Sequence, residues 1–170
     1  IAVSGLTAQN KVYDSDRTAM LTGTAVLDSQ SLIQGDMVSL TGTASGLFAD
    51  KQVGTNKTVT ISGLTLGGAD ASNYNMTSHA ATSANITQKA LTISGITAAS
   101  KTYDGTRNAT VNTANVVRSG LVTGDNLTVT ATGLFSDKNA ANGKTVALTS
   151  TISGEDAGNY SITGQASTLA

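Results

Sequence analysis

Short runs in which apolar residues alternate with small or polar ones recur along the whole chain. The runs lie at 38–40, 57–61, 91–93, 127–131 and 146–148. A period of two residues is typical of half-buried antiparallel strands. Gly, Asn and Asp residues that favour turns separate the runs, and no stretch keeps a helical apolar stripe for three turns. The pattern therefore predicts an all-β fold with at most one helical turn, at 30–34 and again at 119–123.

The same arrangement of residues occurs twice. Residues 1–14 return at 91–104, the Gly-Leu-Phe-x-Asp-Lys run at 46–51 returns at 133–138, and the Asp-Ala-x-Asn-Tyr run at 70–74 returns at 156–160. An offset of 86 to 90 residues is longer than the roughly 20–45-residue units that stack into solenoids. We therefore expect two self-contained domains, which are residues 1–87 and 88–170.

The size of each repeat favours a small antiparallel β-sandwich, somewhat shorter than the ~100 residues of an immunoglobulin domain. The alternative is a β-grasp-like module in which the turn at 30–34 is a reduced helix. The joint at 85–93 contains neither Gly nor Pro, so it is predicted to be short and fairly stiff, in an elongated arrangement. Ile1 matches Leu91 and Ala170 matches Ala84, as expected of a segment of a longer array.

The composition argues against several functional classes. The chain has no Cys, which excludes disulfides and thiolate zinc sites. Its 10 Lys and Arg residues are balanced by 11 acidic ones, so no basic face for nucleic acid is expected. No apolar run approaches the roughly 20 residues of a membrane span. With one His and one Glu, a nucleophile and base pair is not expected, and we predict no enzyme, no catalytic residue and no cofactor.

Three motifs in order, with the joint between the copies, carry a family resemblance. They are Lys-x-Tyr-Asp-Gly-Thr at 101–106, Gly-Leu-Phe-Ser-Asp-Lys at 133–138 and Asp-Ala-Gly-Asn-Tyr at 156–160. The combination resembles the YDG-type repeat of large bacterial surface and secreted adhesins, including filamentous-haemagglutinin-like proteins exported by two-partner secretion. The first copy departs from it, because Ser15 stands where the second copy has Gly105. The resemblance implies an extracellular location on the bacterial outer surface and a role in adhesion or biofilm, and it carries no ligand.

The residues that recur in both copies are predicted to be structural. They are the aromatic residues Tyr13, Tyr103, Phe48, Phe135, Tyr74 and Tyr160, with the turn residues Asp14, Asp104 and Gly105. A module with so few aromatic residues needs them in its core, so we expect buried rings and Tyr hydroxyls bonded to the backbone. The alternative is an exposed Tyr platform for a sugar.

Asp14, Asp16 and Asp104 are the candidates for a calcium site. Calcium takes six to eight oxygen ligands and is bound mainly by carboxylates and carbonyls. An Asp beside Ser or Gly ordinarily caps a turn through backbone hydrogen bonds instead, so no metal is expected and calcium remains the alternative. His79 is replaced by Gln165 in the second copy and is expected to be a surface residue.

The sequence as a whole favours a structural function. We expect a spacer repeat in the stalk of a bacterial surface adhesin, which holds a distal binding region away from the cell. Its partners are then the neighbouring repeats of the same chain, and the fragment is expected to be monomeric. In the alternative, each repeat weakly binds a host glycan, a matrix protein or a biofilm polysaccharide, and repetition makes the binding avid.

Overall fold

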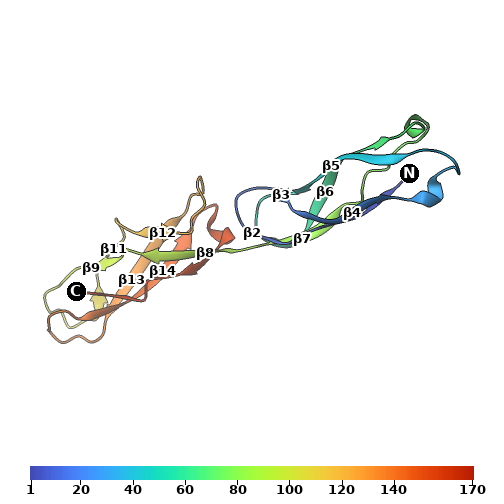
Figure 1. Cartoon of the computed structure of the whole chain (residues 1–170). Coiled ribbons are helices and arrows are strands. Elements are labelled where there is room, and N and C mark those ends of the chain that lie inside the picture. Colours follow the sequence, from blue (N-terminus) through green and yellow to red (C-terminus); the bar gives the residue numbers. More distant parts are fainter. The chain divides into compact units, whose positions relative to one another are not determined.

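The computed structural model describes all residues, 1–170, and divides into two compact units, Ile1–Thr87 (unit 1) and Gln88–Ala170 (unit 2) (Figure 1). Strands form about half of each unit and helices almost none, which confirms the predicted all-β fold. The only helices are three 3₁₀ turns, η1 (Ser29–Ser31), η2 (Ala71–Asn73) and η3 (Ala157–Asn159). A membrane-spanning helix, which must be long and apolar, is therefore not found in this chain.

Unit 1 contains two sheets. In the smaller sheet, β1 (Val3–Ala8) pairs antiparallel with β4 (Leu21–Leu27). The larger sheet has the order β2-β7-β6-β5-β3 and is formed by β2 (Lys11–Val12), β3 (Thr18–Ala19), β5 (Ser39–Phe48), β6 (Gly54–Gly67) and β7 (Thr82–Thr87). All its ladders are antiparallel except that between β2 and β7, which is parallel.

Unit 2 repeats this plan with more interruptions in its strands. Its strands are β8 (Lys89–Ser94), β9 (Thr97–Ala98), β10 (Asn108–Ala109), β11 (Val111–Asn112), β12 (Val117–Ser119), β13 (Thr128–Phe135), β14 (Thr145–Ser153), β15 (Tyr160–Thr163) and β16 (Ser167–Leu169). They form a β10-β13-β14-β16 sheet, a β12-β8-β15 sheet and a β9-β11 pair. The β8-β15 ladder is parallel.

The period of two along the strands determines the core. In β5 and β13, the ring of Phe48 or Phe135 is buried while the preceding Leu47 or Leu134 is nearly half exposed. Successive side chains of a strand point to opposite faces, so the Gly-Leu-Phe run directs its aromatic ring inward. Buried aliphatic side chains complete each core. In unit 1 they are Val3, Leu6, Val59, Ile61 and Ile86, and in unit 2 they are Leu91, Ile93, Ile96, Leu127, Val129 and Val146.

Two details of the predicted fold need correction. The sheets are not purely antiparallel, because the β2-β7 and β8-β15 ladders are parallel. Parallel strands need a long connection, and here most of a unit lies between the two partners. The helical turn is shorter than expected in the first copy, where η1 covers three residues. In the second copy β12 reaches Ser119 and is followed by a turn, so the expected helical turn at 119–123 is absent.

Candidate functional site

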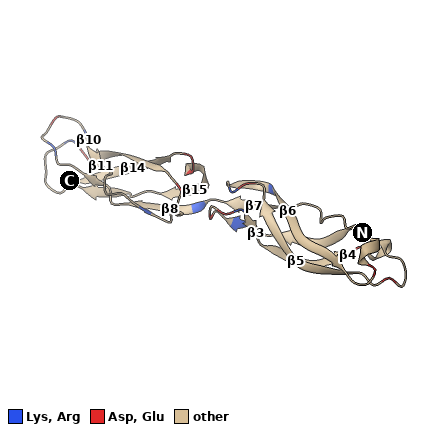
Figure 2. Ribbon diagram, turned by 90° about the horizontal axis from the view of Figure 1, so that it is seen from above, with Lys and Arg blue, Asp and Glu red and all other residues tan.

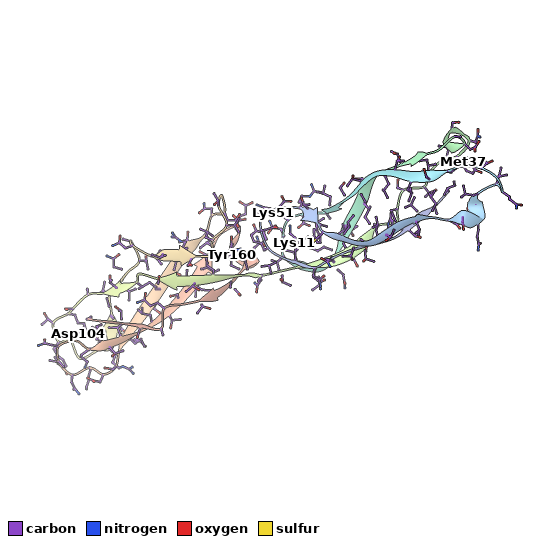
Figure 3. All side chains as sticks on the ribbon, viewed as in Figure 1. Lys11, Met37, Lys51, Asp104 and Tyr160 are labelled. Carbon is purple, nitrogen blue, oxygen red and sulfur yellow. The ribbon has the colours of Figure 1, made fainter.

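The repeated motifs gather at the two ends of each unit. One end, here called the motif end, is formed by residues 10–17 and 48–57 in unit 1 and by residues 100–107 and 135–144 in unit 2. Figure 3 shows Lys11 and Met37 at opposite ends of unit 1, and Asp104 and Tyr160 at opposite ends of unit 2. The other end, called the corner end, carries the Asp-Ala-x-Asn-Tyr run and the loop that it contacts.

A lysine organises the motif end of unit 1. The Lys11 ammonium lies 2.7 Å from Asp14 Oδ1 and donates hydrogen bonds to the carbonyl oxygens of Asp16 (2.9 Å) and Thr18 (3.1 Å). It also lies 5.8 Å from the centroid of the Phe48 ring, within the range of a cation–π interaction. The Lys and Asp of the motif therefore stabilise a single loop, which folds around the Lys11 ammonium group.

The motif end of unit 2 repeats this arrangement. Lys101 Nζ lies 2.8 Å from Asp104 Oδ1 and donates to the Thr106 carbonyl oxygen at 3.0 Å. The centroid of the Phe135 ring lies 5.5 Å away. The hydrogen bond from Lys101, with a further one from the Thr106 N–H, lowers the pKa of Asp104 from 3.8 to about 2. The Asp104 carboxylate therefore already accepts hydrogen bonds from Lys101 and from the Thr106 N–H.

The substitution of Ser for Gly in the first copy leaves the turn unchanged. Ser15 has a φ of +67° and Gly105 has a φ of +77°, so both residues adopt the left-handed conformation. A side chain in this region is unfavourable for most residues. The Ser15 hydroxyl accepts a hydrogen bond of 3.1 Å from Lys51 Nζ, which gives the side chain a role in the loop.

A second lysine in each unit forms an ion pair at the motif end. Lys57 Nζ lies 2.6 Å from Asp50 Oδ1 and lowers the pKa of that carboxyl group, and Lys144 pairs with Asp137 in the same way. Figure 2 shows most of each ribbon without charged residues.

The arginines were not among the residues expected from the sequence to be structural. The Arg17 Nε donates to the Phe48 carbonyl oxygen at 2.9 Å, and the Arg107 Nε donates to that of Phe135 at 2.7 Å. Each bond fixes the end of the strand that carries the buried ring. The available signal was repetition, because both arginines occupy the same place in the repeat.

The tyrosine of the motif is buried in only one unit. In unit 1, Tyr13 is 1% exposed and Ile86 is 1% exposed. Strand β7 extends past Ala84 and pairs through Ile86 with Lys11 of β2. The Tyr13 N–H donates to the Thr87 carbonyl oxygen at 2.8 Å. The end of β7 thus closes the motif end over the tyrosine ring.

In unit 2 the corresponding surface is open. Tyr103 is 60% exposed, so the expectation that its ring is buried is wrong. The residues that correspond to 85–87 would follow Ala170, the last residue of the sequence. A groove of about 460 Å³ is found there instead, lined by Lys101, Tyr103, Phe135, Lys138, Ala141 and Ala170 among others.

The corner end holds the second pair of tyrosines by their hydroxyl groups. In unit 2, the Tyr160 hydroxyl donates to Asp125 Oδ2 at 2.6 Å and accepts from the Val122 N–H at 3.0 Å. Asp156 Oδ2 accepts from the Asn126 N–H at 2.9 Å. Tyr160 and Asp156 are both buried, so these bonds tie the loop before β13 to the start of β15.

The corner end of unit 1 makes the same bonds in a more exposed setting. The Tyr74 hydroxyl donates to Asp36 at 2.7 Å and accepts from the Ile33 N–H at 2.9 Å. The hydrogen bond to Asp36 raises the pKa of Tyr74. Asp70 accepts from the Met37 N–H at 2.8 Å.

The structure gives the three calcium candidates other partners. Asp14 and Asp104 each pair with a lysine, and Asp16 accepts a hydrogen bond from the Thr18 N–H. Asp14 and Asp16 lie in unit 1, whereas Asp104 lies in unit 2. No group of three or more His, Asp or Glu side chains is placed to hold a metal ion. A cation at either turn would have to displace an ammonium group.

His79 has a defined role, contrary to the expectation of an isolated surface residue. Its Nε2 accepts a hydrogen bond of 3.1 Å from the Leu6 N–H, where the β1-β4 register shifts. In unit 2, Gln165 Oε1 accepts from the Ile96 N–H at 2.9 Å. The His79 and Gln165 side chains thus each supply a hydrogen-bond acceptor at equivalent positions. The structure reveals this common role, which the two residue types do not.

The family model that describes the YDG domain matches the chain twice, over residues 1–84 and 87–168. The chain belongs to the YDG domain family. No curated protein and no solved structure matches it. Each match covers one unit, and the tripeptide Tyr103-Asp104-Gly105 stands in the turn that Lys101 closes in the second YDG domain.

Proposed function

We propose that these two YDG domains are a non-enzymatic spacer in the stalk of a bacterial cell-surface adhesin, where they hold a distal binding region away from the cell. The observation that carries this proposal is the joint. Strand β7 ends at Thr87 and β8 begins at Lys89, so Gln88 alone connects the last strand of one unit to the first strand of the next.

The chain on both sides of Gln88 is held by its own unit. Thr87 pairs with Val12, and Lys89 pairs with Tyr160. The side chain of Gln88 donates from Nε2 to the Gly158 carbonyl oxygen at 3.1 Å. A Gly/Ser linker would leave many backbone dihedral angles free, whereas this joint leaves few, which is what a spacer of defined length needs.

The strand directions of unit 1 suit a chain under tension. Because β2 and β7 are parallel, a pull on the N-terminal side of β2 and on the C-terminal side of β7 slides the strands along each other. Their hydrogen bonds then bear the load together instead of opening one after another. The bonds include that from the Tyr13 N–H to the Thr87 carbonyl oxygen. A stalk module outside a bacterium would experience such a load.

The test is the distribution of distances between one spin label in each unit. The chain has no Cys, so Thr24→Cys and Thr130→Cys, both at exposed strand positions, give two unique label sites. We expect a narrow distance distribution by electron–electron double resonance. The matched control carries Gly-Ser-Gly-Ser inserted after Gln88 and should give a broad one. Equal widths in the two proteins would contradict a stiff spacer.

The alternative function, weak multivalent binding of glycans or matrix proteins, is tested on the same protein. A spacer should give no signal above background on a glycan and matrix-protein array, with or without calcium. If each unit separately bound a glycan or a matrix protein, the YDG domains themselves would be the adhesive part of the protein.

A further inference from the structure

A histidine side chain supports the point at which the first strand of unit 1 changes register. The β1-β4 ladder shifts between Ser4 and Leu6, and the intervening Gly5 has a φ of +93°. The Leu6 N–H donates to His79 Nε2 at 3.1 Å. Leu6 is buried, so its N–H would lose its acceptor at a site that is largely covered, which costs free energy.

The two hydrogen bonds of the His79 ring fix its protonation state. Its Nδ1 lies 2.7 Å from the Ala80 carbonyl oxygen, which can only accept, so Nδ1 carries the proton of that bond. The Leu6 N–H can only donate, so Nε2 is unprotonated. Both bonds are therefore made by one form of the ring, the neutral tautomer with its proton on Nδ1. The imidazolium form has a proton on both nitrogens and cannot accept from Leu6.

The strands around this ring carry no charged side chain. Strands β1, β4 and β5, residues 58–67 of β6 and residues 75–87 contain no Asp, Glu, Lys or Arg. The amino group of Ile1 donates to the Asn75 carbonyl oxygen at 2.7 Å. The other titratable groups of unit 1 lie outside these segments, at 11–17, 28–36, 50–57 and 70–74. These segments therefore offer no carboxylate that could stabilise a positive charge on the ring.

Unit 2 makes the same contact with a side chain that does not titrate. Gln165 Oε1 accepts from the Ile96 N–H at 2.9 Å, and its Nε2 donates to the carbonyl oxygens of Ile96 and Ser167 at 2.9 and 3.0 Å. Gly95, which precedes Ile96, has a φ of +80° and corresponds to Gly5. An amide keeps both its donor and its acceptor when the pH changes. The chain therefore contains a titrating and a non-titrating version of one contact.

We propose that His79 is a pH-sensitive latch, which holds residues 75–80 against β1 when its ring is neutral and releases the Leu6 N–H when the ring is protonated. The ring lines a hollow of about 140 Å³ together with Met76 and Ser78, which has room for water to replace it. Histidine ordinarily changes its charge between about pH 5 and 8. Because the closed latch binds one proton fewer than the open one, acid favours the open form. Unit 1 thus loosens in mildly acidic surroundings, and unit 2 does not.

Hydrogen exchange of the intact chain tests the latch. The matched control is His79→Gln, which places the side chain used by unit 2 in unit 1. Protection of the Leu6 N–H, corrected for the intrinsic exchange rate at each pH, should fall about tenfold or more from about pH 7.5 to about pH 5 in the wild type. It should stay constant in the variant, and protection of the Ile96 N–H should stay constant in both proteins.

The comparison of the two proteins isolates the histidine. Titration of every other group, including the amino group of Ile1, is common to both and cancels. Constant protection of the Leu6 N–H in the wild type would overturn the proposal. Equal falls at Leu6 in the wild type and in His79→Gln, or an equal fall at Ile96, would do the same, because the loss would then be general.

The protonation state of the ring is measured directly and needs no variant. The chain has one His, so the ring nitrogens give unambiguous signals in a long-range ¹H–¹⁵N NMR spectrum. At about pH 7.5 we expect the neutral ring to carry its proton on Nδ1, with a scalar coupling across the bond from the Leu6 N–H to Nε2. This coupling should vanish at about pH 5. A neutral ring with its proton on Nε2 would contradict the latch, since it could not accept from Leu6.

Discussion

Tyr13 and Tyr103 occupy the same place in one motif, yet the first ring is 1% exposed and the second is 60% exposed. The lysine, the aspartate and the buried phenylalanine around them are arranged alike in both units. In unit 1 the end of β7 pairs with β2, Ile86 is buried, and the Tyr13 N–H donates to the Thr87 carbonyl oxygen. In unit 1, residues beyond Ala84, the last position that the first family match covers, therefore contribute to the motif end.

At the corner ends, the residues of unit 2 are more deeply buried than those of unit 1. Tyr160 and Asp156 of unit 2 are buried, at 3% and 8% exposed, whereas Tyr74 and Asp70 of unit 1 are only partly buried. The hydrogen bonds are the same in both. Each unit is therefore packed more tightly at one end, and equivalent residues of the two units contribute unequally to stability.

The largest expected effect tests the motif ends. Tyr13→Ala removes a fully buried ring and should lower the free energy of unfolding of unit 1 by about 3–5 kcal/mol. Tyr103→Ala should change that of unit 2 by less than about 0.5 kcal/mol, as is usual for exposed positions. Denaturant unfolding followed by NMR signals of each unit measures both.

Phe135→Ala is the matched control for unit 2. Its ring is 6% exposed, so it should cost about as much as Tyr13→Ala, which shows that unit 2 responds to loss of a core residue. Equal losses for Tyr103→Ala and Tyr13→Ala would mean that Tyr103 is packed in solution.

A smaller effect is expected at the corner ends. Tyr160→Phe leaves the Val122 N–H and Asp125 without the hydroxyl group in a buried setting, which should cost about 1–3 kcal/mol. Tyr74→Phe removes the same two bonds where water can replace them, so its cost should be below about 1 kcal/mol. Thermal unfolding of each unit compares the two variants, and a larger loss in unit 1 would contradict the difference in burial.

The predictable part of this molecule follows from local patterns. Alternation along the chain predicts the strands, because a strand has only two faces, and the scarcity of aromatic residues predicts the buried rings of Phe48 and Phe135. Repetition predicts that the Tyr and Asp residues of the motif are structural, and in the structure the Asp of each copy pairs with the Lys of the same loop. The family resemblance adds the YDG domain, which the family model also finds.

The rest depends on contacts between residues far apart in the sequence. Ile86 and Lys11 pair across the whole of unit 1, so the motif alone does not reveal which tyrosine is covered. His79 and Gln165 share a role only because each meets the backbone N–H of a distant residue, Leu6 or Ile96. Residue type gives no signal for such a pair, whose members differ in shape and in chemical group.

The smallest expected effect concerns the charge of the motif loop in unit 2. Hydrogen bonds from Lys101 and the Thr106 N–H lower the pKa of Asp104 to about 2, from its ordinary value of 3.8. A carboxyl group whose pKa is lower in the folded protein stabilises the fold above the unfolded pKa. This contribution is therefore complete above pH 4 or so and is lost as the pH falls from about 4 towards 2.

A carboxyl ¹³C NMR titration measures this pKa directly. Lys101→Gln should raise the pKa of Asp104 towards 3.8 but not fully to it, because the bond from the Thr106 N–H remains. Added salt should act in the same direction and less strongly, since ions screen an exposed pair but do not replace a backbone hydrogen bond. If Lys101→Gln left the pKa of Asp104 unchanged, the loop would be held by its backbone alone. The ammonium that closes it in both units would then be a consequence of the turn and not its cause.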